Sequence, residues 1–187
     1  MKLRRLAVTA IAAVAAASSL AACGSDSKPT VAKTEGTYVN TGDLAYQVQI
    51  SRQLNADDYE DRDYLTGLPT GAGKLAVGQE WFAVFIRVFN MDKVPHPAAS
   101  QFTIRDTTGK VYKPFRLDPR INRTAYLPLR VGSGDQIPVP GSLARENLTQ
   151  GGLILFRVNN SSYSSRPLEL DITPPEGGPS ARVDLDV

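Results

Sequence analysis

The only cysteine of the chain, Cys23, is the first residue that could do specific chemistry. It follows Leu20-Ala21-Ala22, and a lone thiol cannot close an intramolecular disulfide, so the folded part must be held by its core. Upstream, a positively charged start at residues 1–5 leads into an apolar run at residues 6–17, which is the layout of a secretory signal. We therefore expect residues 1–22 to be a removable signal peptide.

The order Leu-Ala-Ala-Cys resembles the lipobox of bacterial lipoproteins. In that family the cysteine receives a diacylglycerol, and the leader is cut just before it. The resemblance implies that Cys23 is lipidated and that the mature protein lies on the outer face of the cell membrane. Each buried methylene adds about 0.8 kcal/mol, and two acyl chains anchor stably where one binds reversibly. The alternative is an ordinary secretory leader that happens to contain a cysteine.

A second group of residues forms a basic segment between positions 110 and 130, where Asp118 is the one acidic residue. Its members are Lys110, Lys113, Arg116, Arg120, Arg123 and Arg130. Guanidinium groups suit phosphate and carboxylate, so the basic segment is a candidate contact for an anionic cell-wall polymer or an acidic envelope protein. Two alternatives remain: the segment pairs with the acidic residues of the same chain, or it is solvated surface.

Those acidic residues form an acidic segment at positions 57–63. They are Asp57, Asp58, Glu60, Asp61 and Asp63. Carboxylates are the hard oxygen ligands that calcium requires, but the spacing does not match an EF-hand loop. A solvated helical turn is the expected structure, with calcium binding as the weaker alternative.

Catalytic patterns are weak. The sole histidine, His96, lies between two prolines, and no Gly-x-Ser-x-Gly sequence accompanies it. Met91 and His96 are too few to make a copper site. Neither a Walker loop nor a dinucleotide-binding glycine pattern is present. We expect a non-catalytic module without a cofactor, and the alternative is an envelope hydrolase that uses carboxylates.

The charge of the mature chain differs from that of the whole. The 187 residues include 21 basic and 19 acidic side chains, but three of the basic ones lie in the expected leader. Their removal leaves 18 against 19, and this near-neutral balance argues against general nucleic-acid binding. No second long apolar run follows, so the lipid is the only membrane attachment that we expect.

The elements that must position these residues are strands. Residues 44–50, 168–172 and 183–187 alternate apolar with polar side chains, the period of a half-buried strand. Residues 102–104 and 111–112 flank a turn with Gly109, which predicts a hairpin. Two weaker segments are expected at 124–131, interrupted by Pro128, and at 136–140 as an edge. Short strands between Gly, Pro and Asn turns predict an all-β antiparallel sandwich.

Residues 81–89 give the strongest strand prediction in the sequence. One face of this strand would present Phe82, Val84, Ile86 and Val88, and the other Trp81, Ala83, Phe85 and Phe89, with Arg87 as the sole charge. A strand that is apolar on both faces belongs in the middle of a packed sheet. Residues 153–158 predict a second buried strand. Within the long connection at 51–78, residues 55–65 favour one or two helical turns capped by Asn55.

The segments 78–90, 102–112 and 152–158 resemble, in order and pattern, the telokin-like, immunoglobulin-like domain of unknown function found in Gram-positive lipoproteins. Shorter stretches at 60–65, 95–97 and 166–170 resemble uncharacterised actinobacterial lipoproteins of that kind. The resemblance implies an immunoglobulin-like β-sandwich and supplies no catalytic residues. We therefore expect a signal peptide at 1–22, the lipidated cysteine with a flexible linker at 23–37, and a monomeric sandwich domain at 38–187.

Overall fold

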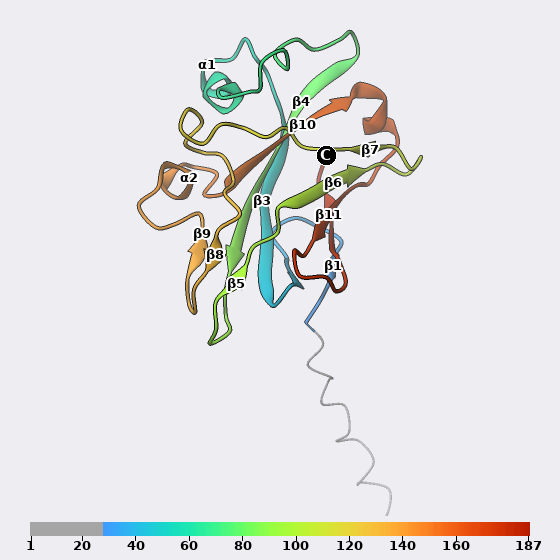
Figure 1. Ribbon diagram of the computed structural model, residues 1–187. Helices are drawn as coiled ribbons and strands as arrows, with labels where there is room; N and C mark the ends of the chain where they lie inside the picture. Colours follow the sequence, from blue (N-terminus) through green and yellow to red (C-terminus); the bar gives the residue numbers. More distant parts are fainter. Residues whose placement is uncertain (1–27) are drawn as a thin grey trace, which may run out of the picture.

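A computed structural model describes residues 28–187 as two β-sheets packed face to face (Figure 1). The β11 sheet contains, in spatial order, β1 (Val31–Ala32), β12 (Ala181–Leu185), β11 (Leu168–Thr173), β6 (Gln101–Arg105) and β7 (Val111–Tyr112). The β4 sheet contains β10 (Gly152–Asn159), β4 (Gln79–Phe89), β3 (Leu44–Leu54) and β2 (Tyr38–Thr41), and β9 (Gln136–Ile137) pairs with the end of β4. The expected antiparallel β-sandwich is confirmed.

The remaining elements are short. β5 (His96–Pro97) and β8 (Arg130–Val131) form a separate antiparallel pair. The helical turns are α1 (Tyr59–Arg62), η1 (Asp63–Leu65), α2 (Leu143–Glu146) and η2 (Asn160–Ser164). Every strand pair is antiparallel except β1 with β12, which run parallel.

β4 lies between β3 and β10 and buries both of its faces, as its sequence predicts. Phe82, Val84, Ile86 and Val88 point into the core between the sheets. The opposite face packs into a second cluster, formed by Leu54, Tyr64, Trp81, Ala83, Phe85, Leu117, Leu153 and Leu155. The β4 sheet therefore has an apolar outer face that requires a cover.

That cover comes from two connections. Tyr64, Leu65 and Leu68 of the long 51–78 connection pack over the second cluster, and Phe115, Leu117 and Ala125 join them from the segment after β7. The rings of Tyr64 and Phe85 meet edge to face with centroids 5.0 Å apart. The long connection thus forms part of a third layer, and Figure 1 draws it, with α1, at the top of the molecule.

The predicted helical turns are present, but their cap is not the expected residue. α1 begins after Asp58, whose side chain accepts a hydrogen bond from the Glu60 backbone N–H at 2.8 Å. Asn55 instead accepts from the Asp57 N–H at 3.0 Å, in the turn before the helix. Both residue types favour such local bonds, so the sequence alone does not decide between them.

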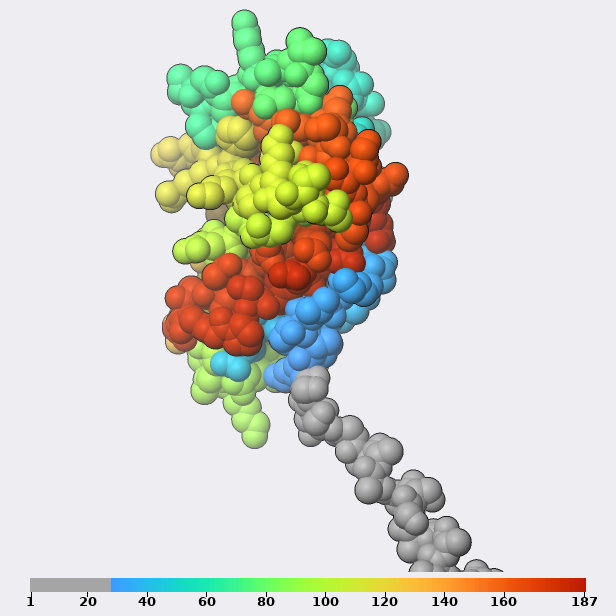
Figure 2. Space-filling model, turned by 90° about the vertical axis from the view of Figure 1, so that its right-hand side faces the viewer, coloured from blue at the N-terminus to red at the C-terminus, as the bar shows by residue number. Residues whose placement is uncertain are grey.

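The predicted linker at 23–37 overlaps the folded domain. Val31 and Ala32 pair with Arg182 and Val183 of β12, and Ala32 is buried. The Glu35 carboxylate accepts hydrogen bonds from the backbone N–H groups of Ser51, at 2.9 Å, and Asp186, at 3.1 Å. In Figure 2 the blue N-terminal segment lies alongside the red C-terminal segment. Residues 31–37 therefore belong to the folded domain, although their small polar composition predicts a tether.

Two proline-containing segments pair with each other. In the first, after the end of β4, His96 pairs with Val131 and Pro97 with Arg130. The predicted weak strand at 124–131 is reduced to a bridge between Ala125 and Leu153 and to the two residues of β8. A pair of two-residue strands needs few N–H donors, which explains how prolines are accommodated there.

Candidate functional site

The basic segment does not form one patch. Lys110 lies in the turn between β6 and β7, and Arg130 lies on β8. Figure 1 draws β7 and β8 on opposite sides of the molecule, because the chain crosses the outer edge of β10 between them. Closeness in sequence therefore does not bring these cations together in space.

Several cations of the basic segment have local partners. Arg120 Nη2 lies 2.9 Å from Asp118 Oδ2, and Arg130 Nη2 donates to the Pro95 carbonyl at 2.9 Å. Lys110 Nζ lies 5.4 Å from the centre of the Tyr112 ring. Across residues 28–187, no ion pair links this segment to the acidic segment. Lys113, Arg116 and Arg123 are exposed and form none of these pairs.

The acidic segment is not brought together around a common point. Asp58 caps α1, while the buried Asp61 forms an ion pair with Arg52 and accepts from the Asn55 N–H at 2.8 Å. Burial raises the pKa of Asp61, but the hydrogen bonds and charge outweigh it and leave that pKa below its ordinary value. The described part of the chain contains no group of three or more His, Cys, Asp or Glu residues that could hold a metal ion.

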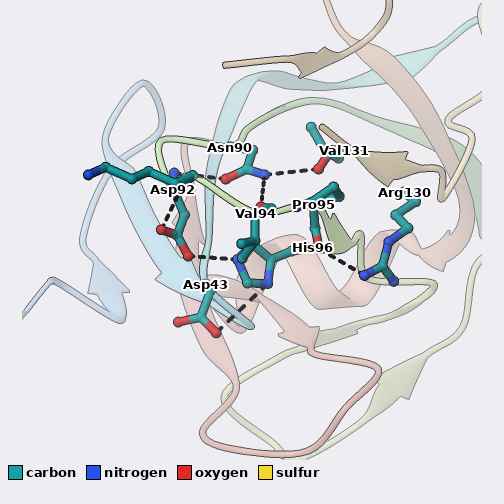
Figure 3. A network of polar contacts seen from close by, with 9 residues as sticks. Asp43, Asn90, Asp92, Val94, Pro95, His96, Arg130 and Val131 are labelled. Atoms are coloured by element: carbon teal, nitrogen blue, oxygen red, sulfur yellow. Dashed lines mark hydrogen bonds and ion pairs between the residues drawn. The ribbon is translucent and has the colours of Figure 1, made fainter. Parts of the chain in front are cut away.

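His96 lies in a network of polar contacts that joins two loops and β8 (Figure 3). Its Nε2 lies 2.8 Å from Asp92 Oδ2, and its Nδ1 lies 4.0 Å from Asp43 Oδ2. The hydrogen bond from His96 holds the pKa of Asp92 below its usual value. The interactions join the β2–β3 turn to the loop that follows β4.

Asn90 completes this network. Its side-chain amide donates to the carbonyls of Val94, at 2.7 Å, and Val131, at 2.9 Å (Figure 3). Asn90 is buried, so these bonds satisfy a polar group that would otherwise be costly. The bonds hold the loop against β8, which assigns the His96 network a structural role.

Sequence reasoning missed a different pair of cations, Arg87 and Arg145. Arg87 lies on the outer face of β4, beyond the end of the second cluster, with its guanidinium 4.8 Å from the centre of the Phe89 ring. Its Nη2 donates to Gln136 Oε1 at 3.3 Å, but its buried Nε has no partner. Arg145 of α2 likewise has a buried Nη1 without a partner.

Burial and charge both act on Arg87. Burial lowers the pKa of Arg87, and the charge of Arg145 lowers it further. Arg145 lies on α2, which packs beside β10, and Gly152, at the start of β10, pairs with Ile86, the neighbour of Arg87 in β4. Neither arginine forms an ion pair with a carboxylate of residues 28–187. The one available signal was Arg87 itself, the single charge within residues 81–89.

A shallow pocket of about 200 Å³ lies next to Gln136, lined by residues of β8 and β9 and by Val139 and Pro140. Around it the apolar side chains of Leu129 and Val139 are partly exposed. Its lining also includes the charged Arg130 and Asp135, and Gln136 is the residue that accepts the hydrogen bond from Arg87.

The predictions for Cys23 and for the signal peptide concern residues 1–27 and so lie outside the described residues. Within the described part, no helix is long and apolar enough to span a bilayer.

No protein-family profile matches the chain, and no curated protein sequence matches it. Among solved structures, the chain is similar to the yjhA protein from Bacillus subtilis, with a TM-score of 0.55 and 11% identity over 82% of this chain and 99% of that one. At this identity the likeness shows the fold alone.

Two further structures align over most of the chain at lower similarity. One is an uncharacterized β-sandwich protein from Clostridium difficile, with a TM-score of 0.42 and 11% identity over 87% of this chain and 99% of that one. The other is MPT63, a secreted protein from Mycobacterium tuberculosis, with a TM-score of 0.48 and 15% identity over 86% of this chain and 99% of that one.

Proposed function

We propose that this protein is a non-catalytic binding module of the cell envelope, held on the outer face of the membrane by a lipid on Cys23. The observation that carries the proposal is the position of the only cysteine, directly after Leu20-Ala21-Ala22 and close to the start of the sandwich. Only residues 24–30 separate Cys23 from the first strand, and seven residues span at most about 25 Å. The sandwich would thus work close to the membrane surface.

The structure supports a module because the sandwich is complete within the described residues. Both sheets, the core between them and the covered outer face all come from residues 28–187. The lipid then supplies location, and the faces and loops of the sandwich supply contacts. The partner class that we propose is anionic, an envelope polymer or an acidic protein.

Lipid attachment is tested by growing cells with a fatty-acid analogue. We expect label on the wild type and none on Cys23→Ala, which should either leave the membrane or remain an unprocessed precursor. Ser18→Ala, an alteration inside the leader that leaves the cysteine in place, serves as the matched control and should be labelled normally. Equal label on wild type and Cys23→Ala would refute lipidation at this residue.

A further inference from the structure

The loop at residues 91–95, between β4 and β5, presents apolar side chains to solvent from a fixed backbone. Met91 is 85% exposed and Val94 is 53% exposed. The side chain of Asn90 holds the loop in place: its amide donates to the Val94 carbonyl at 2.7 Å, and its oxygen accepts from the Asp92 N–H at 2.8 Å. The loop therefore offers two apolar side chains for contact without first having to be ordered.

The described chain begins at the same end of the sandwich. The Pro29 carbonyl accepts hydrogen bonds from the backbone N–H of Asn40, at 2.7 Å, and from its side chain, at 3.4 Å. Asn40 lies in β2, just before the β2–β3 turn, and Asp43 of that turn lies 4.0 Å from His96, where the loop ends. Figures 1 and 2 both show the blue N-terminal segment beginning at the end from which the green loop at 91–95 projects.

Neighbouring loops at this end have no comparable side chains. Hydrogen bonds place residues 132–135 beside the end of β4 and residues 174–180 beside the end of β2. The first of these loops reads Gly-Ser-Gly-Asp, and the second contains only Pro, Gly, Ser and Glu. The β2–β3 turn consists of one glycine and one aspartate. Met91 and Val94 are thus the large apolar side chains that these loops expose.

The length of the tether limits how far this end can lie from an anchored cysteine. Residues 24–28 separate Cys23 from Pro29, and this stretch, fully extended, spans about 20 Å. A second contact made across so short a link is effectively intramolecular. A weak apolar contact therefore reaches an occupancy that the same contact would not reach in a free protein.

We propose that the 91–95 loop contacts the lipid bilayer to which Cys23 anchors the chain. This deepens the proposed function and rests on it for the anchor alone. Met91 and Val94 enter the boundary between headgroups and acyl chains, where surface-bound proteins bury their apolar side chains. Lys93, exposed between them, lies at the level of the headgroup phosphates.

The acidic residues of this end determine how the contact depends on charge. Asp92 is engaged within the loop, since its Oδ1 accepts from the Lys93 N–H at 2.7 Å and its Oδ2 lies 2.8 Å from His96 Nε2. Asp43 is exposed and opposes the attraction of Lys93 to anionic lipid. We therefore expect the contact to depend on apolar burial more than on salt.

The test places a tryptophan at either end of β4. Met91→Trp carries it on the loop, and Val77→Trp, the matched control, carries it at a fully exposed apolar position before the start of the strand. The strand has 11 residues, so the two positions are on the order of 35 Å apart. Trp81, the natural tryptophan, is buried and gives the same background in both variants.

The full chains, produced and processed by the cell, are reconstituted into vesicles of phosphatidylcholine with and without phosphatidylglycerol. Lipids brominated on their acyl chains quench tryptophans that reach them. Met91→Trp fluorescence should shift to shorter wavelength and lose several times more intensity to brominated lipid than Val77→Trp. Adding Val94→Asp to Met91→Trp should remove most of this loss, because a carboxylate resists burial, and adding Val94→Leu should preserve it.

The proposal is overturned if Met91→Trp is quenched no more than Val77→Trp, or if Val94→Asp leaves the quenching unchanged. Absence of the acyl mass on the purified chain would instead refute the lipid anchor. In that case the free Cys23 thiol is coupled to a maleimide-bearing lipid, and the same comparison of Met91→Trp with Val77→Trp decides whether the loop contacts the bilayer. The two proposals can thus fail separately.

Discussion

Asp106 shows how single residues fix the loops of this sandwich. It is 5% exposed and lies at the start of the β6–β7 turn. Its Oδ1 accepts from the backbone N–H groups of Thr108 and Lys110, each at 3.0 Å, and its Oδ2 accepts from the Ser162 hydroxyl at 2.8 Å. Ser162 in turn contacts the Tyr112 hydroxyl. One carboxylate therefore ties the hairpin to η2.

This network predicts a pH dependence. Burial raises the pKa of Asp106, but hydrogen bonds from Thr108 and Ser162 outweigh it, so its folded pKa lies below the ordinary value near 3.8. A lowered folded pKa stabilises the protein above the unfolded pKa, and that stability is lost as pH falls through the folded pKa. Asp106→Asn should thus be less stable than wild type at pH 7, and the difference should shrink below about pH 4.

Urea unfolding of both proteins at several pH values measures this difference. Asp57→Asn, an exposed carboxylate, is the control and should follow wild type throughout. A constant gap between Asp106→Asn and wild type from pH 7 to pH 3 would contradict ionisation as the cause.

At the level of elements, β1 decides where the domain begins. It adds a parallel strand to β12, and the neighbouring backbone contributes hydrogen bonds from Arg182 N to Thr30 O, at 2.8 Å, and from Asn40 N to Pro29 O, at 2.7 Å. A two-residue strand has too few positions to show a period, which is why its sequence resembles a linker. Its pairing depends on a strand about 150 residues away in sequence.

A truncation tests this boundary. A chain starting at residue 38 should be less stable than one starting at residue 28, at about 1 kcal/mol per net hydrogen bond lost. The loss also exposes the buried face of Ala32. Denaturant midpoints of the two chains give the difference, and Glu35→Ala in the longer chain isolates the share of the Glu35 carboxylate. Equal midpoints would show that residues 28–37 add no stability to the domain, as expected if 23–37 were all linker.

The central strands could be predicted because their evidence is local. The side chains of residues 81–89 predict the two buried faces of β4. The turn with Gly109, whose φ is 85°, predicts the β6–β7 hairpin. The cover of the second cluster could not be predicted in this way. This cover brings together Tyr64 and Phe115 from two separate connections. No local periodicity of apolar residues predicts that contact.

The same contrast between local signals and contacts of distant segments applies to the candidate site residues. Arg87 is conspicuous in the sequence as the only charge of residues 81–89, whereas Arg145 lies on α2, whose position beside β10 depends on the fold. The basic segment, in contrast, is obvious in the sequence and is dispersed by the path of the chain from β7 to β8. Spacing predicts strand faces well and predicts clusters between separate elements poorly.

For the whole molecule, the sheet edges determine whether the sandwich stays a monomer. In the described chain the edge strands β1 and β7 have two residues each and β2 has four. The eight-residue edge strand β10 is covered instead. Phe115 N donates to Leu155 O at 2.8 Å, and Leu153 N donates to Thr124 O at 2.8 Å. Short or covered edges disfavour pairing with a second copy.

We therefore expect the chain that starts at residue 28 to be monomeric, with one molar mass in light scattering across a wide concentration range. Phe115→Pro removes the N–H that covers β10 and should produce concentration-dependent association. Phe115→Ala, which keeps this N–H while losing the same ring, is the matched control and should be destabilised without associating. A wild-type dimer, or equal association of the two variants, would show that edge coverage does not determine the oligomeric state.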